Sequence, residues 1–192
     1  MNVLETIKVR RSVGKVTEKK PTREQIEILL DAACQAPNHH MVEPWRYFVI
    51  AGVARAELSK IMVESLTTKL ENTTDDKAQA LLEKEGNKLF RAPVVIIAAS
   101  LKPSSPKVVD IENVEAVAAA VQNMLLAAQE IGLVAIWRTG EPAYDPAIKA
   151  FLGLEPEEHI VAFVYLGYPA MPNTERTPNQ FENKTQWLGW ED

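Results

Sequence analysis

Cysteine and histidine are scarce in this sequence of 192 residues. The single cysteine, Cys34, has no partner for an internal disulfide, so nothing in the sequence indicates an oxidising compartment. One cysteine also excludes cysteine-rich zinc sites and iron–sulfur clusters. Two of the three histidines, His39 and His40, are adjacent and point in different directions. With only His159 remaining, we predict no metal site.

Closely spaced glycines are also missing. The sequence has eight glycines, and no two stand closer together than Gly132 and Gly140. This spacing excludes G-x-G-x-x-G, the Walker A loop and G-x-S-x-G, all of which need closer pairs. If the chain binds a nucleotide, it uses neither the standard Rossmann turn nor a P-loop.

Long apolar segments are absent as well. The longest apolar run lies around residues 93–99, which is far too short to span a bilayer. Residues 1–12 contain no apolar stretch typical of a secretory signal, so we predict a cytoplasmic protein that does not associate with membranes. Hydrophobic residues make up 46% and charged residues 24%, which is typical of a folded globular protein. The length suits a single domain over residues 1–192.

Positive charge is concentrated at the start of the chain. Residues 1–23 carry seven basic and two acidic side chains, a net +5, and because the whole chain is −5 the remainder is −10. A nucleic-acid-binding protein usually has a broader basic excess, so nucleic acid is not an expected partner. A short basic segment on an acidic body suits one small anionic ligand, although a solvated basic face is the simpler explanation of charge alone.

Capping signals and hydrophobic periodicity predict a mixture of helices and strands. Asn2 with Glu5, and Thr22 with Gln25, have the spacing of capping boxes that begin helices. Helices are expected over residues 2–11, 22–36, 53–71, 75–90 and 110–131 and after Asp145-Pro146, and strands over 45–50, 93–99, 133–137 and 160–166. This pattern indicates an α/β or α+β sandwich with four or five strands.

Two segments point to a subunit interface. Residues 116–129 carry no charge and are almost entirely apolar, which predicts a helix buried on all sides. A domain this small rarely encloses such a helix unaided, so a partner subunit is expected to cover part of it. Trp187 and Trp190 lie in an otherwise polar tail, which predicts that the tail packs on something, such as a partner chain.

Two short motifs could bind an anion. Arg10, Arg11 and Ser12 place two guanidinium groups and a hydroxyl side by side, which suits a phosphate. The two arginines could instead complement the negative end of the first helix. Trp137-Arg138-Thr139 ends a buried strand, where Arg138 needs an anion or a carboxylate partner. Nothing in the sequence has the spacing of a hydrolytic triad or a carboxylate dyad.

Together these motifs resemble the nitroreductase-like flavoproteins, and within them the short NAD(P)H nitroreductase branch. Three pieces carry the resemblance, from Leu4 to about Gly167: Arg10-Arg11-Ser12, the run 36–39 leading into 44–50, and the segment 132–140. The resemblance implies an α+β three-layer sandwich. Its central, mainly antiparallel sheet would have four strands plus one from the partner's C-terminal tail, residues 168–192.

The resemblance further implies a homodimer with FMN at the subunit interface. NADH or NADPH would reduce FMN, which would then reduce a nitroaromatic, a quinone or a related small-molecule acceptor by a ping-pong hydride transfer. No protein side chain would act as a catalytic group, because the flavin carries the chemistry. The FMN-binding residues would be Arg10, Arg11, Ser12, Trp137, Arg138 and Thr139, with Gln35 and His39 reaching the flavin from the other subunit. The nicotinamide nucleotide would contact Ala127, Ala128, Gln129, Glu130, Ile131 and Gly132.

Three positions depart from the family pattern. Gln35 stands where an arginine is common, His40 where a lysine occurs, and Glu43 replaces the usual glutamine. These changes put the flavin contacts and the reduction potential in question, since nearby charge tunes a flavin. A flavin carrier or redox sensor without nitroreductase activity is an alternative function. A specialised dehalogenase or flavin-destroying enzyme is another.

Overall fold

Four antiparallel strands form the centre of the structure, a computed structural model that describes residues 2–172 and 180–190. Their order across the sheet is β1-β2-β4-β3, so β2 and β4 are the inner strands. The strands are β1 (Trp45–Ala51), β2 (Val94–Ser100), β3 (Val134–Arg138) and β4 (His159–Gly167). The predicted α+β class with an antiparallel sheet is confirmed. A fifth strand from a partner stays a prediction.

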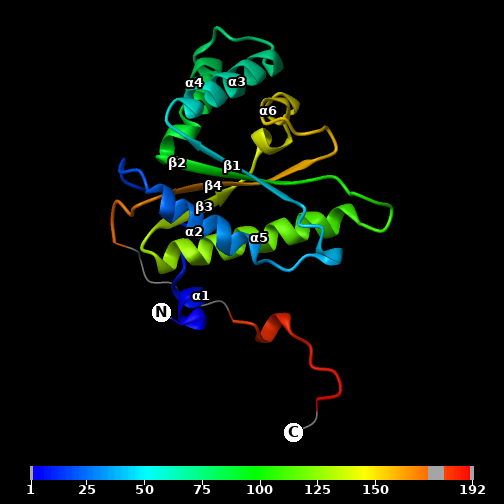
Figure 1. Cartoon of the computed structure of the whole chain (residues 1–192). Helices are drawn as coiled ribbons and strands as arrows, with labels where there is room; N and C mark the ends of the chain where they lie inside the picture. Colours follow the sequence, from blue (N-terminus) through cyan, green and yellow to red (C-terminus); the bar gives the residue numbers. More distant parts are fainter. Residues whose placement is uncertain (1, 173–179, 191–192) are drawn as a thin grey trace.

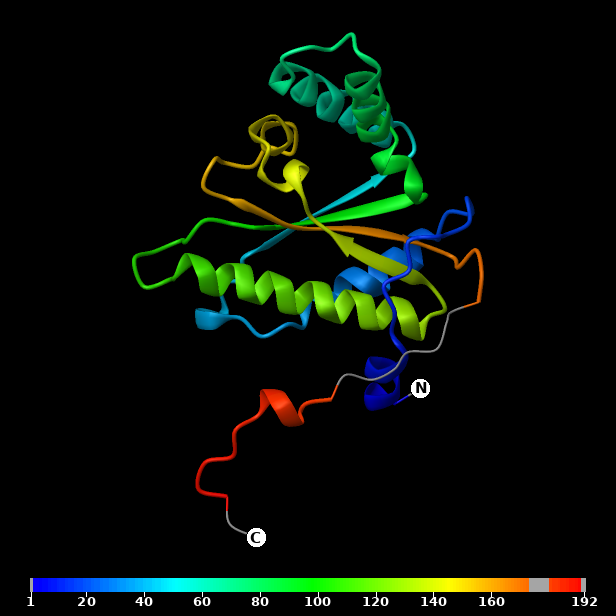
Figure 2. The same cartoon turned by 180° about the vertical axis from the view of Figure 1, so that it is seen from behind.

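Helices cover both faces of the sheet, which gives three layers (Figures 1 and 2). One face carries α2 (Arg23–Cys34) and α5 (Asp110–Glu130), with α1 (Val3–Val9) beneath the end of α5. The other face carries α3 (Val53–Lys69), α4 (Asp76–Gly86) and α6 (Pro146–Phe151). Short 3-10 turns are η1 (His39–Met41), η2 (Lys88–Arg91), η3 (Glu141–Tyr144) and η4 (Glu182–Lys184). In the described part of the chain, no helix is long and apolar enough to cross a membrane.

The inner strand β2 is buried on both faces, as its unbroken apolar run predicts. Successive side chains of a strand point to opposite faces. Val94 and Ile96 therefore pack with α2 and α5, whereas Val95 and Ile97 pack with the helices of the other face. The two cores are thus separated by one strand that contributes to both.

Both predicted capping boxes are present. The Asn2 side chain accepts a hydrogen bond from the backbone N–H of Glu5 at 3.0 Å, and the Glu5 carboxylate accepts one from the N–H of Asn2 at 3.1 Å. Thr22 and Gln25 make the same exchange at the start of α2. Each cap satisfies backbone donors that the helix itself leaves unpaired.

The helix expected over residues 75–90 ends earlier than the sequence predicts. It stops at Gly86, whose carbonyl accepts a hydrogen bond from the Ser59 hydroxyl of α3. The chain then turns through η2, which brings Lys88 and Arg91 over the sheet instead of extending them along the helix. This tertiary hydrogen bond between α3 and α4 cannot be inferred from local sequence.

The long helix α5 is not buried on all sides in one chain. Ala116 and Ala120 are buried against the sheet, whereas Ala119 and Leu126 are only half-buried. The helix has the sheet on one side and α2 on another, and in the described residues no third layer covers the rest (Figure 2). A single chain therefore does not bury all of α5. Burial of the remaining surface by a partner subunit, which the sequence leads us to expect, stays a prediction.

Residues 180–190 of the tail lie away from the three layers (Figure 1). Trp187 and Trp190 contact each other, with ring centroids 5.5 Å apart, and are 62% and 72% exposed. Residues 173–179 and 191–192 of the predicted partner-binding tail lie outside the described residues. Packing of this tail on a second chain stays a prediction.

Candidate anion-binding site

The segment that follows α1 lies along the edge of the sheet. Ser12 forms a parallel bridge with Ala135 of β3, and the N–H of Val13 donates to the Ala135 carbonyl at 3.0 Å. Farther along, Val16 pairs antiparallel with Pro169, just beyond β4. The segment therefore joins the outer strand β3 to the end of the inner strand β4.

Gly14 of this segment lies directly beside Arg138. A Cβ atom at position 14 would stand 3.5 Å from Nη2 of Arg138 and 3.9 Å from the side chain of Ile136. The Arg138 guanidinium group therefore folds back from the end of β3 to the N-terminal segment. Two predicted phosphate-binding motifs, far apart in the sequence, are brought to the same edge of the sheet.

Arg10 and Arg11 lie where the N-terminal segment leaves α1. Arg10 is the C-cap of that helix, and its N–H donates to the Thr6 carbonyl at 3.0 Å. Both arginines are half-buried, while Ser12 is exposed. They are thus close in the chain to the bridge with β3, but they do not line the cavity described next.

A cavity of about 320 Å³ adjoins Arg138, and we call it the basic pocket. It lies on the α3 face of the sheet, between η2, η3 and the strands β3 and β4. Three of its side chains are cationic and none is a carboxylate. The lining residues are Met62, Lys88, Arg91, Arg138, Thr139, Gly140, Pro142, Phe163 and Tyr165.

The two arginines of the basic pocket differ from its lysine in their ion pairing. Among the described residues, no carboxylate lies within 4.0 Å of Arg91 or Arg138, whereas Lys88 pairs with Glu85 of α4. Burial raises the pKa of Tyr165, the positive charges of Arg91 and Arg138 oppose that rise, and the negative charge of Glu85 adds to it. Both arginines and this phenol line the same cavity.

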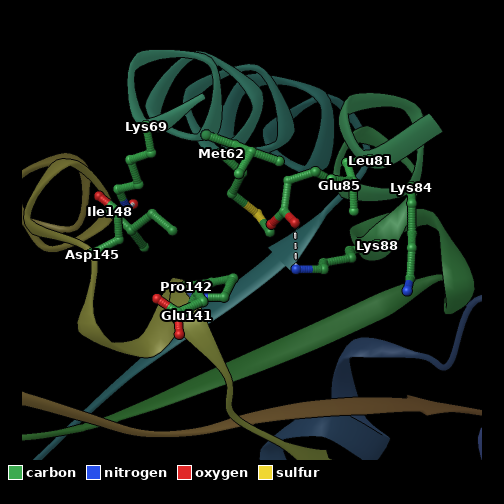
Figure 3. Close-up of a pocket in the computed structure, with 11 residues that line it drawn as sticks. Met62, Lys69, Leu81, Lys84, Glu85, Lys88, Glu141, Pro142, Asp145 and Ile148 are labelled. Carbon is green, nitrogen blue, oxygen red and sulfur yellow. Dashed lines mark hydrogen bonds and ion pairs between the residues drawn. The ribbon is translucent and has the colours of Figure 1, made fainter. Parts of the chain in front are cut away.

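A second cavity of about 330 Å³ opens next to the basic pocket, between α3, α4 and α6 (Figure 3). We call it the paired pocket because four of its six charged side chains form ion pairs with each other. Lys69 contacts Asp145 at 2.6 Å, and Lys88 pairs with Glu85 (dashed line in Figure 3). Met62, Lys88 and Pro142 line both cavities.

Asp145 is the most connected group of the paired pocket. Its carboxylate accepts hydrogen bonds from Lys69, from the Ser65 hydroxyl and from the N–H of Ala147, the last as the N-cap of α6. Burial alone would raise the pKa of Asp145, but these hydrogen bonds lower it below its usual range. The group therefore holds α3 and α6 together.

Trp137 points to the opposite face of the sheet from Arg138. Its Nε1 donates to the Val161 carbonyl at 3.0 Å, and its ring packs with the core below α5. Thr139 lines the basic pocket and is followed by Gly140, whose φ of 93° favours glycine. Arg138 and Thr139 are thus together, and a flavin contact for Trp137 stays a prediction.

Gln35 and His39 lie on the far side of the sheet from the basic pocket. The Gln35 amide donates to the Asp31 carbonyl at 3.4 Å, and His39 Nδ1 is 3.3 Å from the Glu112 carboxylate. Beyond His39, the left-handed region holds His40, Met41 and Glu43, with φ between 46° and 55°. Such strain in non-glycine residues is typical of functional loops. Within one chain these residues do not meet Arg138.

The segment predicted to bind a nicotinamide nucleotide is the end of α5 and the turn after it. Ala127 lines a groove of about 480 Å³ together with Gln35 of α2 and Val3 of α1. Glu130 accepts a hydrogen bond from the Thr6 hydroxyl at 3.1 Å. This groove also lies on the α5 face, so the predicted residues fall into two groups, one on each side of the sheet.

Sequence patterns missed Lys88 and Arg91. Lys88 was expected near the end of the helix over residues 75–90 and Arg91 just beyond it, and neither was singled out as a site residue. Their spacing just before the buried strand β2 is the only local signal for a basic site. The described residues contain no group of three or more potential metal ligands, which agrees with the sequence but does not test it.

Comparisons with known proteins identify the class to which this fold and site belong. The model of the nitroreductase family matches residues 7–168, so the chain belongs to the nitroreductase family. It is 33% identical to the Escherichia coli K12 protein "Putative NAD(P)H nitroreductase YdjA", over 89% of this chain and 90% of that protein. A similar protein is "Putative NAD(P)H nitroreductase YfhC" of Bacillus subtilis, at 27% identity over 90% and 88% of the two chains.

Solved structures of nitroreductase-like proteins resemble this chain over nearly its whole length. A nitroreductase-like family protein from Bacillus cereus has a TM-score of 0.80 and 25% identity, over 98% of this chain and 97% of that chain. A nitroreductase from Desulfovibrio desulfuricans, solved in complex with FMN, has a TM-score of 0.69 and 25% identity, over 93% and 92%. The predicted family and fold are therefore confirmed.

Proposed function

We propose that this chain is an FMN-dependent NAD(P)H oxidoreductase that reduces nitroaromatics, quinones or related small molecules. The observation that carries the proposal is the meeting of the Ser12–Gly14 segment with Arg138 beside a pocket of unpaired guanidinium groups. FMN ends in a phosphate, and a phosphate is held well by paired N–H donors of arginine. The family match and the FMN-bound Desulfovibrio relative support this ligand.

In this proposal, Arg10, Arg11 and Ser12 bind the phosphate end of FMN together with Arg138 and Thr139. When bound, the flavin supplies hydride transfer, so the protein needs no nucleophile of its own. The side chains act by binding and orienting: the arginines fix the phosphate, and the segment at Gly14 lies beside the Arg138 guanidinium. Alternating use of NAD(P)H and acceptor at one site would give ping-pong kinetics.

We further propose that the functional unit is a homodimer. Gln35 and His39 lie across the sheet from Arg138, so a single chain cannot bring all predicted flavin contacts to one ligand. Val3 and Leu4 of α1 are 70% and 69% exposed, which leaves an apolar surface for a second copy. Light scattering at defined concentration tests this, and a monomer that binds FMN fully would contradict it.

The cofactor proposal is tested by the visible spectrum of the purified protein. A yellow preparation that releases FMN on denaturation is expected, followed by bleaching with NADH or NADPH and re-oxidation by a quinone or nitroaromatic. Initial rates at several fixed acceptor concentrations should give parallel double-reciprocal lines. Bound FMN that stays oxidised under excess NADH and NADPH would instead identify a flavin carrier. No turnover with FMN fully bound would reject the oxidoreductase.

A further inference from the structure

The turn η2 brings Arg91 to the same cavity as Arg138, although no motif in the sequence marks it. The two residues come from different elements, η2 and β3, and both line the basic pocket. In the described part of the chain, neither has a carboxylate within 4.0 Å. Lys88 is the third cation, but Glu85 partly neutralises it.

Two unpaired cations that face one cavity are better explained by a ligand than by packing. Like charges that line one cavity repel each other, and an anion bound between them removes that repulsion. Tyr165, which lines the same cavity, is only 6% exposed, so the space extends inward to a buried side chain. Both arginine side chains are exposed, so an anion that enters from solvent can reach them.

The size and donor set of the pocket indicate what the anion is. A volume of about 320 Å³ is at the lower end of ligand pockets and suits a phosphoryl group with its attached chain, not a whole dinucleotide. Two guanidinium groups can each donate paired hydrogen bonds to a tetrahedral dianion, and Thr139 adds a hydroxyl. A phosphate monoester meets these requirements better than a carboxylate, which carries a single charge.

We propose that Arg91 is a phosphate-binding residue that, together with Arg138, clamps a phosphate monoester in the basic pocket. This inference rests on the proposed function, which supplies two ligands of that chemistry. One is the phosphate of FMN, and the other is the 2′-phosphate that distinguishes NADPH from NADH. Arg91 thereby determines either flavin retention or the preference between the two nicotinamide nucleotides.

The test compares ligands that differ only in the phosphate. We would measure the Kd of FMN and of riboflavin, and the KM of NADPH and of NADH, for the wild type, Arg91→Ala and Arg91→Lys. If the flavin phosphate occupies the clamp, Arg91→Ala weakens FMN roughly tenfold or more and leaves riboflavin unchanged. If the nucleotide phosphate occupies it, the KM of NADPH rises by a similar factor and that of NADH does not. Arg91→Lys should restore part of the loss, because it keeps the charge but not the planar fork.

Lys84→Ala is the matched control, since Lys84 lies near the same turn but lines only the paired pocket. It removes the same charge and should change none of the four constants. In the double variant Arg91→Ala/Arg138→Ala, the losses should be smaller than the product of the two single effects, because both residues bind one phosphate. Thermal unfolding of each variant verifies that the fold is intact.

The proposal is overturned if Arg91→Ala changes phosphorylated and unphosphorylated ligands equally, or changes none of them. Failure of the proposed function is recognised separately, by a wild type that binds no flavin. In that event, inorganic phosphate and pyrophosphate are added in a thermal-shift assay. An upward shift for the wild type that is lost in Arg91→Ala and kept in Lys84→Ala supports the clamp, and equal shifts in all three reject it.

Discussion

The basic pocket and the paired pocket lie side by side and share Met62, Lys88 and Pro142, yet their charges are arranged differently. In the paired pocket, Asp145 forms an ion pair with Lys69, and Glu85 forms one with Lys88. In the basic pocket, neither arginine has a carboxylate of the described residues within 4.0 Å. Ion pairs within the protein are thus concentrated in one cavity, and the arginines of the next are left without one.

This difference separates residues that hold the fold from residues that await a ligand. A buried charge network contributes to stability only when its members are paired, so removing one partner is costly. An unpaired cation contributes little to stability or opposes it, so removing it costs only binding. The four predictions that follow test this division, beginning with the largest expected effect.

Replacing Asp145 by alanine should give the largest loss of stability. The change removes the N-cap of α6 and leaves Lys69 and Ser65 without their acceptor. We expect the free energy of unfolding to fall by about 2–4 kcal/mol, measured by urea denaturation. FMN affinity of the folded variant should stay near that of the wild type. A loss below about 0.5 kcal/mol would mean that the paired pocket is not structural.

Low pH should remove the stabilisation that Asp145 contributes to the fold. Because the pKa of Asp145 is lowered in the folded protein, its stabilisation is present above the unfolded-state value of 3.8 and is lost as the pH falls through the folded-state pKa. The stability difference between the wild type and Asp145→Ala should therefore be constant near neutrality and shrink as the pH falls below about 4. Denaturation at a series of pH values measures it, and a gap independent of pH contradicts the assignment.

Replacing Arg138 by alanine should have the opposite pattern. Because Arg138 has no ion pair with the described residues, its loss should change the free energy of unfolding by no more than about 0.5 kcal/mol. FMN affinity should fall roughly tenfold or more, because a charge-assisted contact to phosphate is lost. Fluorescence titration with FMN measures this effect, which should diminish as salt concentration rises. Unchanged FMN retention would remove Arg138 from the site.

The smallest expected effect comes from Glu85→Gln, which removes the negative charge that pairs with Lys88. Lys88 lines both cavities and is held by Glu85. Neutralising Glu85 should strengthen FMN binding by a few-fold, because the Lys88 ammonium group, no longer paired, adds to the positive potential of the basic pocket. Glu83→Gln on the exposed side of α4 is the control and should have no effect. Weaker binding in Glu85→Gln would show that Glu85 instead positions Lys88.

The features that could be predicted from the sequence are those set by near neighbours in the chain. Asn2 and Thr22 begin helices because each side chain reaches a backbone N–H three residues on. The strand β2 is recognisable because both of its faces are apolar. Arg138 could be singled out because a charge at the end of an apolar strand needs an anion.

Contacts between distant residues could not be predicted in the same way. Lys69 and Asp145 are 76 positions apart, and nothing in either local sequence indicates the other. Arg91 reaches its pocket only because α4 ends at Gly86. There the Ser59 hydroxyl of α3 donates a hydrogen bond to the Gly86 carbonyl.

The bridges from Ser12 to Ala135 and from Val16 to Pro169 have a consequence for synthesis of the chain. Residues 12–16 leave the ribosome before β3, β4 and the turn after them, and must wait for these before they can adopt their final conformation. Contacts of such long sequence separation form slowly, because a large loop must close first. Capacity to hold a flavin is therefore expected late in folding, and free FMN would act as a ligand that selects finished molecules from unfinished ones.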